Sequence, residues 1–402
     1  MAVVFSSISL RGFLSFGPQA PAIELGDVTV LLGPNGVGKS NLVEALDVLR
    51  SAPGDLPLPI RRGGGVREWM WKGPRKAVAD SCLLELVAAP GIVGRAAKNR
   101  KLADPAVRYT LQFGAEGDRF AVLNERIENA SALPGEDKPY FYFGFERGVP
   151  FLNRMQAQAS RQLKREDIDP TQSILSQRRD PEEYPELARL AASLSSIRIY
   201  RNWVFGPDAP IRRACPADAR TDRLEEAMDN LPVRIGALRR DPEVRRRLQE
   251  LVRLIADGYD DVDLVPEGGV LQLYLTEGDR SFPARRLSDG TLRMLALGAI
   301  LLDPAPNSML VIEEPELGLH PDLMPALRDM LLYAAERAQV IVTTHSTVLA
   351  DAFTTRPEAV LIVEKAEGET TTQRLSAADL ARADGMGIGA LWMAGRLGGT
   401  RW

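Results

Sequence analysis

The sequence predicts an α/β fold that is split in two by a long insertion. An apolar run, a glycine-rich turn and a helix-like pattern follow one another over Val28–Leu46, which is typical of a strand–turn–helix unit. Alternating helix and strand patterns return only after about residue 280. Since 402 residues are too many for one ordinary core, we expect two or three lobes.

The N-terminal part is predicted to contain short strands and one helix. Residues 3–33 should form two or three strands broken by Gly-Pro turns, and a helix is expected over residues 40–50. A loop rich in Pro and Gly follows over residues 51–73. Three strand-like pieces come next, at residues 81–88, 107–114 and 119–128. The last two are expected to pair as a hairpin through the turn 115–118.

From about residue 145 to residue 260 the pattern is helical. Residues 241–258 show it best, because five apolar side chains share one helical face: Val244, Leu248, Leu251, Val252 and Ile255. Gly258 is expected to end this helix. The α/β pattern then returns, with helices or strands expected at 287–302, 308–316, 320–338, 339–346 and 359–365.

The composition argues against a chain covered in positive charge for nucleic-acid binding. There are 50 basic and 54 acidic side chains, which give a net charge of −4. Apolar residues make up 45% of the chain, enough for a sizeable buried interior. The two cysteines, Cys82 and Cys215, lie far apart, so we expect no disulfide framework and no metal knuckle.

The sequence predicts neither export nor a membrane span. The first ten residues, MAVVFSSISL, lack a positively charged start and hold only a short apolar run, so no signal peptide is expected. The longest apolar stretch, Met294–Leu302, is about half as long as a membrane-spanning helix must be. We therefore expect a cytoplasmic protein without a membrane partner.

The turn after Leu32 fits a phosphate-binding loop, since Gly33, Gly38, Lys39 and Ser40 match G-x-x-x-x-G-K-[ST]. Glycines let backbone N–H groups close around phosphate oxygens, and the following helix points its positive end at them. Lys39 can reach the β- and γ-phosphates, and Ser40 can ligate Mg²⁺. The alternative is a tight turn in which the Lys-Ser pair is incidental. The expected nucleotide-binding residues are Gly33, Pro34, Asn35, Gly36, Val37, Gly38, Lys39, Ser40 and Asn41.

Two carboxylates follow an apolar strand in the sequence SMLVIEEPELGLHP. Unpaired charges at the end of a buried strand are unfavourable by several kcal/mol each, as a rough estimate, and a hydrated Mg²⁺ with an attacking water would offset this. We assign Glu313 to the metal, through water, and Glu314 to orienting or deprotonating the attacking water. The alternative is a solvent-exposed acidic turn before Pro315.

The chain has 2 histidines, and they receive different interpretations. His345 ends an apolar strand pattern, where a neutral imidazole could donate to a γ-phosphate; a plain turn residue is the alternative. His320 precedes Pro321, which suits the first position of a helix, and is interpreted as structural.

A third motif opens the helix expected at residues 287–302. Ser288 or Asp289 can simply cap that helix. The alternative is that Ser288, Asp289 and Gly290 form a second anion-binding helix terminus.

Nucleic-acid contacts have weaker support in the sequence. Seven arginines between Arg234 and Arg253 outnumber three acidic residues, so the local charge is +4, and such a stripe could lie on phosphates or be a solvated helix face. Aromatic residues that could stack on bases, or pack in the core, are Phe141, Tyr142, Phe143, Tyr200 and Trp203.

Taken in order, the motifs GPNGVGKSN, LSDGTLR, VIEEPELGLHP and IVTTHS resemble the ABC-type ATPase heads of the SMC, RecF and OLD-like group. The likeness is greatest to stand-alone bacterial "AAA family" predicted ATPases, which the segments QSILSQRRDPEEYPELARL and LWMAGRLGGTRW also resemble. The resemblance implies a P-loop NTPase fold with a mixed sheet, flanking helices, an antiparallel β lobe and a helical insertion. We expect the ATPase domain at 1–75 and 266–402, the β lobe at 76–140 and the insertion at 141–265.

The resemblance also implies roles for the site residues. ATP with Mg²⁺ would be sandwiched in a head-to-head homodimer or higher even oligomer, and residues 287–291 would cover the γ-phosphate bound by the other subunit. Lys39, Glu314 and His345 would be catalytic, with Glu314 the catalytic glutamate and His345 the switch histidine, while Ser40 and Glu313 would hold the metal.

Departures from the family pattern are also visible in the sequence. Glu313 stands where Asp is usual, no Gln marks a lever loop near residues 61–69, and Leu14 stands where many relatives carry Lys or Arg. Only 57 residues follow His345, too few for the Toprim nuclease domain of OLD proteins, so any nuclease is expected to be a separate chain.

Three functions are compatible with these motifs. The first is an ATPase whose dimerisation and hydrolysis serve a nucleic-acid task or a separate effector protein, such as anti-phage defence or DNA repair. The second is a non-enzymatic switch that ATP locks and an effector reads; an intact Glu314 argues against it. The third is the motor of a membrane transporter, which the long gap between Lys39 and Ser288 disfavours.

Overall fold

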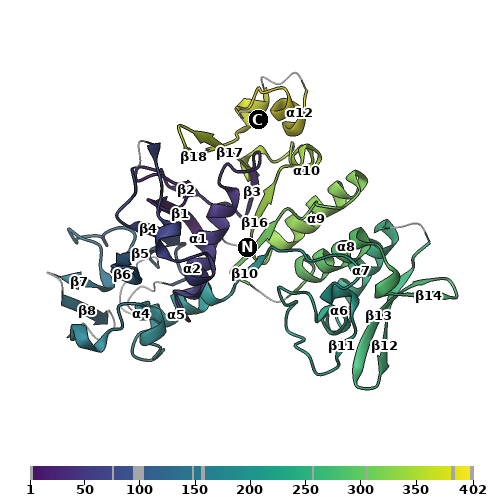
Figure 1. Ribbon diagram of the computed structural model, residues 1–402, viewed down its shortest axis with the longest axis horizontal. Helices are drawn as coiled ribbons and strands as arrows, with labels where there is room; N and C mark the ends of the chain where they lie inside the picture. Colours follow the sequence, from purple (N-terminus) through teal and green to yellow (C-terminus); the bar gives the residue numbers. More distant parts are fainter. Residues whose placement is uncertain are drawn as a thin grey trace.

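The computed structural model describes residues 3–74, 77–93, 104–146, 149–154, 159–255, 258–304, 307–381 and 385–398. These residues form three sheets: an antiparallel one of eight strands, a mostly parallel one of six and a smaller one of four. The parallel sheet lies in the middle of the molecule, between the antiparallel sheet and the smaller sheet with its helices (Figure 1). No described helix has the length and apolar character needed to cross a membrane.

The central sheet is parallel except for its last strand. Its strands, in spatial order, are β10 (Ile197–Tyr200), β15 (Met309–Glu313), β16 (Gln339–Thr344), β3 (Val28–Leu32), β17 (Val360–Ala366) and the antiparallel β18 (Glu369–Arg374). All five residues of β3 are buried, as expected for a parallel strand that is covered on both faces. Leu31 belongs to one hydrophobic core, whereas Val30 and Leu32 belong to the other, so the sheet separates two cores.

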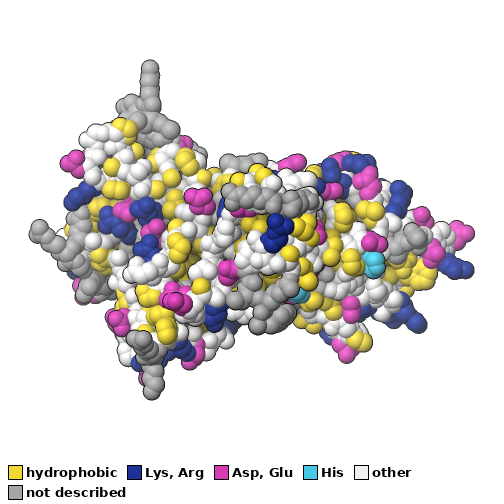
Figure 2. Space-filling model, turned by 90° about the horizontal axis from the view of Figure 1, so that it is seen from above, with side chains coloured by type: hydrophobic (Ala, Val, Ile, Leu, Met, Phe, Trp, Pro, Cys, Tyr) yellow, Lys and Arg dark blue, Asp and Glu magenta, His cyan; other side chains and the backbone are white. Residues whose placement is uncertain are grey.

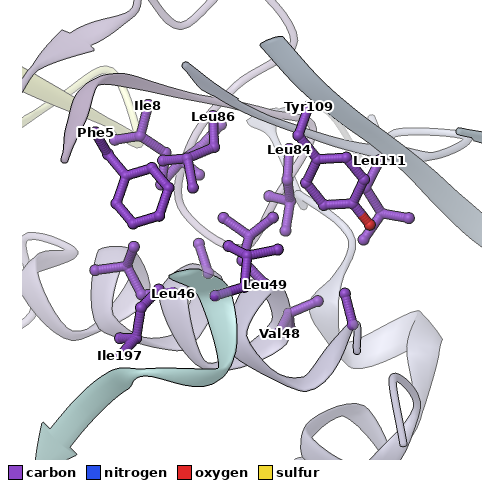
Figure 3. Packing of buried hydrophobic residues seen from close by; sticks show 14 of the residues in the cluster. Phe5, Ile8, Leu46, Val48, Leu49, Leu84, Leu86, Tyr109, Leu111 and Ile197 are labelled. Carbon is purple, nitrogen blue, oxygen red and sulfur yellow. The ribbon is translucent and has the colours of Figure 1, made fainter. Parts of the chain in front are cut away.

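The antiparallel sheet packs on one side of α1 (Lys39–Ser51). Its strands, in spatial order, are β2 (Ile23–Glu24), β1 (Phe5–Arg11), β4 (Cys82–Ala88), β5 (Val107–Glu116), β6 (Arg119–Asn129), β7 (Phe141–Glu146), β8 (Val149–Arg154) and β9 (Ala159–Gln162). Figure 3 shows Phe5, Leu84 and Leu86 of this sheet above Leu46 and Leu49 of α1. The expected hairpin at its centre is confirmed, with Glu116 opposite Arg119.

The segments 141–146, 149–154 and 159–162, expected within a helical insertion, are instead strands β7, β8 and β9 of this sheet. Aromatic side chains favour strands, and the pairing of Phe143 with Leu152 buries apolar groups that a short isolated helix would expose. The loop expected at 51–73 holds two short helices, α2 (Leu58–Arg62) and α3 (Val66–Trp69). Further along, α4 (Ile174–Gln177) and α5 (Pro185–Ser195) lead into β10 of the central sheet.

The third lobe joins helices to the smallest sheet. Its elements are α6 (Leu231–Leu238), α7 (Pro242–Ile255), α8 (Asp289–Leu301), β11 (Cys215–Pro216), β12 (Asp261–Glu267), β13 (Val270–Glu277) and β14 (Arg280–Pro283). The predicted apolar face of α7 is confirmed, since Val244, Leu248, Leu251 and Val252 are buried and Ile255 is partly buried against the same core. The remaining helices, α9 (Met324–Ala335), α10 (Thr347–Ala352), α11 (Ala377–Ala381) and α12 (Ile388–Met393), follow the central strands.

Candidate nucleotide-binding site

The motifs converge at one edge of the central sheet. Strands β15, β16 and β3 are neighbours and run parallel, so their carboxyl ends lie at the same edge. The glycine-rich loop follows β3, the tandem glutamates end β15, and His345 follows β16. Segments that are about 300 residues apart in the chain are therefore brought together at one site.

The glycine-rich loop has the conformation that its glycines permit. Gly36 has φ 77° and Gly38 has φ 106°, both in the left-handed region that L side chains rarely adopt. A Cβ atom on Gly33 would lie 2.3 Å from the carbonyl oxygen of Val363, so a larger residue there would clash with backbone. Val37 is buried and anchors the loop, while Asn35 is exposed.

Lys39 crosses the loop from the first turn of α1. Its ammonium donates hydrogen bonds to the carbonyl oxygens of Gly33 at 2.7 Å and Pro34 at 2.8 Å. The side chain is buried, and this burial lowers the pKa of Lys39, whereas the carboxylates nearby, Glu314 foremost, raise it. The cation is thus held beside the loop and faces the carboxylates at the end of β15.

Two hydroxyl residues that the sequence interpretation missed hold the loop from outside. Thr370 of β18 donates to the carbonyl of Val37 at 2.6 Å, and its hydroxyl lies 2.5 Å from that of Ser15. Asn41, in the first turn of α1, donates to the Ser15 hydroxyl at 2.6 Å. A Cβ atom on Gly38 would meet both hydroxyls, Thr370 at 2.1 Å and Ser15 at 2.4 Å. The absence of a side chain at Gly38 therefore permits this network.

Leu14 and the segment 61–69, where the sequence departs from the family pattern, both have structural contacts. Leu14 adopts φ 49°, and its backbone N–H donates to the carbonyl of Trp69 at 2.8 Å, so this position contributes backbone contacts and partly buried packing. The segment 61–69 ends α2 and forms α3, where Trp69 is buried against Phe13 with ring centroids 5.6 Å apart. Both segments pack in the core that α1 shares with the antiparallel sheet.

Glu313, the last residue of β15, lies in contact with Ser40 in the first turn of α1. The Ser40 hydroxyl hydrogen-bonds to the Glu313 carboxylate, which lowers its pKa, but burial has the larger effect and raises it. The backbone carbonyl of Glu313 accepts a 2.8 Å hydrogen bond from Trp203 Nε1. A hydroxyl beside one carboxylate is the protein ligand set that Mg²⁺ uses together with substrate phosphates. These two residues therefore fit the metal role, and the bound ion would supply positive charge to the phosphates.

Glu314 sits one residue beyond the strand in an unusual conformation. Its φ is 46°, in the left-handed region, and its backbone N–H donates to the carbonyl of Thr343 at 2.9 Å. One carboxylate oxygen lies 3.2 Å from Nδ1 of His345. The carboxylate and the imidazole, predicted separately from two motifs, are thus hydrogen-bonding partners at the sheet edge.

Glu316 is a further carboxylate at this edge that the sequence interpretation missed. It is buried, and the Thr344 hydroxyl donates to its Oε1 atom. Its Oε2 atom is also buried and has no hydrogen-bond partner among the described residues. Burial raises the pKa of Glu316, and the nearby His345 acts in the opposite direction. Within the described residues, no cluster of three or more His, Cys, Asp or Glu side chains could hold a metal ion.

The turn before α8 is capped as the simpler interpretation expects. The Ser288 hydroxyl accepts a 3.0 Å hydrogen bond from the backbone N–H of Thr291. Ser288 and Asp289 are nevertheless exposed, so the turn also faces solvent. A Cβ atom on Gly290 would lie 2.8 Å from the carbonyl oxygen of Gly318, which places the turn beside the segment that follows the tandem glutamates.

The remaining candidates have mainly structural surroundings. The His320 ring accepts a 3.3 Å hydrogen bond from the backbone of Asp322 and caps the short turn that follows it. Tyr142, Phe143 and Tyr200 are buried in the two cores, as the packing interpretation predicts.

The chain shares its fold with solved head domains of SMC proteins. An SmcHead bound to the C-winged helix domain of ScpA gives a TM-score of 0.57 at 14% identity, over 93% of this chain and 99% of that chain. An Smc head domain derived from Pyrococcus furiosus gives 0.56 at 14% identity, over 94% and 98%. One derived from Pyrococcus yayanosii gives 0.53 at 13% identity, over 93% and 98%. At identities this low, the likeness shows a common fold and nothing further.

A curated relative matches a shorter segment. The chromosome partition protein Smc of Clostridium kluyveri (strain NBRC 12016) is 33% identical over 73 residues, which are 18% of this chain and 6% of that protein. The chain therefore corresponds to a small part of that relative's length.

A family model described as "AAA domain, putative AbiEii toxin, Type IV TA system" matches residues 28–79 and 107–351. These ranges make up more than half of the chain and include the glycine-rich loop, the tandem glutamates and His345. The parallel sheet with its antiparallel lobe is the SMC head type of P-loop ATPase fold. The chain thus has the fold of SMC head domains and belongs to this AAA-domain family.

Proposed function

We propose that this protein binds Mg-ATP at the Gly33–Asn41 loop and hydrolyses it with Glu314. The observation that carries the proposal is the meeting of the loop, the Ser40–Glu313 contact and the Glu314–His345 pair at one sheet edge. Lys39 would bind the β- and γ-phosphates, and Ser40 with Glu313 would hold Mg²⁺. Glu314 would orient and deprotonate the attacking water, while the imidazole of His345 would contact the γ-phosphate.

Head-to-head dimerisation is supported by apolar side chains around the site. Val204 is 59% exposed, Leu317 49% and Val348 43%. Each lies within three residues of a site residue: Val204 beside Trp203, Leu317 beyond Glu314 and Val348 beyond His345. A contiguous apolar patch beside the site would mark a surface that becomes buried in a complex, and these three side chains are the candidates for it. We assign them to the second copy, whose Ser288 turn would cover the γ-phosphate.

The coupled task is proposed to run through a separate effector protein in the cytosol. The family description names a toxin–antitoxin system, and the curated relative is a chromosome partition protein, so defence and DNA repair are the candidate settings. Direct nucleic-acid binding by α7 has less support, because Arg246 pairs with Glu243 and Glu250 and Arg247 stacks on Tyr333. Figure 2 shows basic and acidic side chains interspersed on the face it presents.

Phosphate release tests the enzymatic proposal directly. Purified protein with Mg-ATP is expected to release phosphate well above a Glu314→Gln variant, and to sediment as a dimer when ATP is present. The alternative is the non-enzymatic switch, in which ATP shifts sedimentation but the two proteins release phosphate equally slowly. The intact pair of Glu314 and His345 favours hydrolysis.

A further inference from the structure

The buried Arg293 lies over the rings of Trp203 and Phe205, next to the backbone of the tandem glutamates. Arg293, on the second turn of α8, donates a 2.7 Å hydrogen bond from Nη2 to the carbonyl oxygen of Glu314. Its guanidinium carbon lies 4.5 Å from the ring centroid of Trp203 and 5.3 Å from that of Phe205. Trp203 in turn donates to the carbonyl of Glu313. The consecutive carbonyls of the two glutamates are therefore each held by a side-chain donor, the buried Arg293 and the partly buried Trp203.

The hydrogen bond from Arg293 binds the carbonyl of Glu314, whose backbone conformation is unfavourable on its own. Glu314 has φ 46°, a conformation that is unfavourable for residues with a Cβ atom and persists where surrounding contacts impose it. Its backbone N–H is bound by Thr343 on one side, and its carbonyl by Arg293 on the other. The direction of the Glu314 carboxylate follows from that backbone conformation, and this carboxylate meets His345 at 3.2 Å.

The cluster is not arranged for stability alone. Arg293 is 2% exposed, and its Nε atom has no hydrogen-bond partner among the described residues, like Oε2 of Glu316. Burial lowers the pKa of Arg293 to about 10, although Glu316 and Glu314 act in the opposite direction. Buried polar atoms without partners are unfavourable, and their presence near a site is typical of groups that are kept for function.

The segment that carries Trp203 also contacts the exposed turn at the start of α8. The backbone N–H of Gly206 donates to Asp289 at 3.2 Å, and Arg212 forms an ion pair with Asp289. Arg212 also donates to the carbonyl of Leu287 at 2.7 Å. The loop that carries Trp203 is therefore attached both to the turn before α8 and to the tandem glutamates, and α8 itself connects the turn to Arg293.

We propose that Arg293 is a positioning residue for Glu314. It holds the left-handed peptide that aims the Glu314 carboxylate, and α8 ties that conformation to the Ser288 turn which the second copy's nucleotide would contact. This inference rests on the proposed ATPase function. Trp203 plays the same part for Glu313 through its indole N–H.

The test compares Arg293→Met with a matched variant elsewhere on the molecule. Arg337 is half-buried and, like Arg293, lies over an aromatic ring, with its guanidinium carbon 3.8 Å from the ring centroid of Tyr333. It donates to the carbonyl of Leu301 at the far end of α8. Arg337→Met removes the same kinds of contact away from the site. We expect Arg293→Met to lower kcat for phosphate release about 10²-fold, with KM and ATP-dependent dimerisation within about twofold of wild type. Arg337→Met should keep kcat.

Two further variants separate positioning from folding. Arg293→Lys keeps a donor for the Glu314 carbonyl and is expected to recover part of kcat, while Trp203→Phe keeps the ring, removes the bond to Glu313 and should lower kcat with unchanged melting temperature. Equal kcat for Arg293→Met and Arg337→Met would overturn the positioning role. Failure of the proposed function looks different: wild type would then release no more phosphate than Glu314→Gln.

Discussion

The ammonium group of Lys39 lies 2.7 Å from the carbonyl oxygen of Gly33, within the loop that its own helix follows. A phosphate oxygen would compete for the same ammonium, and a charge-assisted bond is the stronger of the two. We therefore expect Lys39→Ala to weaken ATP binding by at least about 2 kcal/mol, as loss of a charged hydrogen bond implies. Titration calorimetry with Mg-ATP measures it, with Lys138→Ala, an exposed lysine outside the loop, as control. Unchanged affinity in Lys39→Ala would contradict the loop assignment.

Glu314→Gln should separate binding from hydrolysis. The amide keeps the size of the carboxylate and can still contact His345, but it cannot take a proton from the attacking water. Loss of a general base typically lowers kcat by about 10²- to 10⁴-fold. We expect that reduction with ATP affinity retained, measured by single-turnover phosphate release. A variant that hydrolyses ATP like wild type would assign the base to another group, for which the buried carboxylate of Glu316 is a candidate.

Ser288→Arg should block the proposed dimer while leaving nucleotide binding intact. Ser288 is exposed at the start of α8, so an arginine there fits the monomer but obstructs a second copy. The change also removes the helix cap, worth roughly 1 kcal/mol. Ser288→Ala loses the same cap without bulk or charge and is the control. Sedimentation with Mg-ATP should show a dimer for wild type and Ser288→Ala, and a monomer for Ser288→Arg; a dimer in all three would remove the role of this turn.

The strand, glycine-rich turn and helix over Val28–Ser51 were predictable from sequence because their determinants are local. Gly33, Gly38, Lys39 and Ser40 lie within one strand–turn–helix unit, and the structure shows that unit. The tandem glutamates were predictable for the same reason, as polar residues at the end of an apolar strand. Their supports were not: Arg293 binds the Glu314 carbonyl from 21 residues away, and Ser15 meets Thr370 across 355 residues. Such pairings depend on topology, which periodicity does not specify.

The extent of the antiparallel lobe shows the same limit. Residues 141–146 carry aromatic side chains whose spacing fits either a strand or a helix when read alone. These residues form a strand because they pair with β6 and β8. Such pairing depends on tertiary contacts, which the local sequence pattern does not specify. Glu313 stands where Asp is usual in the family pattern. Its longer side chain reaches the Ser40 hydroxyl and hydrogen-bonds to it.

Two loop glycines should tolerate alanine unequally. Both Gly36 and Gly38 have positive φ, so either substitution introduces strain of roughly 1–2 kcal/mol. A Cβ atom on Gly36 would meet nothing within 4 Å, whereas one on Gly38 would lie 2.1 Å from the Thr370 hydroxyl. We expect Gly38→Ala to lower both the unfolding free energy and ATP affinity more than Gly36→Ala does. Urea denaturation and calorimetry give the comparison; equal effects would mean that the hydroxyl network adjusts freely.

The buried carboxyl of Glu125 should make the stability of the antiparallel lobe depend on pH. Its Oε1 accepts from the hydroxyls of Tyr109 and Ser173, and its Oε2 accepts from the backbone of Ile174 at 2.8 Å. Burial raises the pKa of Glu125 above its ordinary value of 4.5, against the effect of these bonds. In the window between the two pKa values the folded state keeps a proton that the unfolded chain has lost. The free energy of unfolding should therefore fall as pH rises from about 4.5 and level off above the folded pKa.

Glu125→Gln should remove that fall, because the amide does not titrate and its NH₂ group can donate to the two hydroxyls while its oxygen accepts from Ile174. Urea denaturation at a series of pH values gives the difference between variant and wild type, in which the effects of other titrating groups cancel. The exposed Glu116→Gln, near the same lobe, is the control and should follow wild type. If the Glu125→Gln curve parallels wild type across the whole range, the carboxyl is ionised in the folded protein and its buried bonds outweigh desolvation.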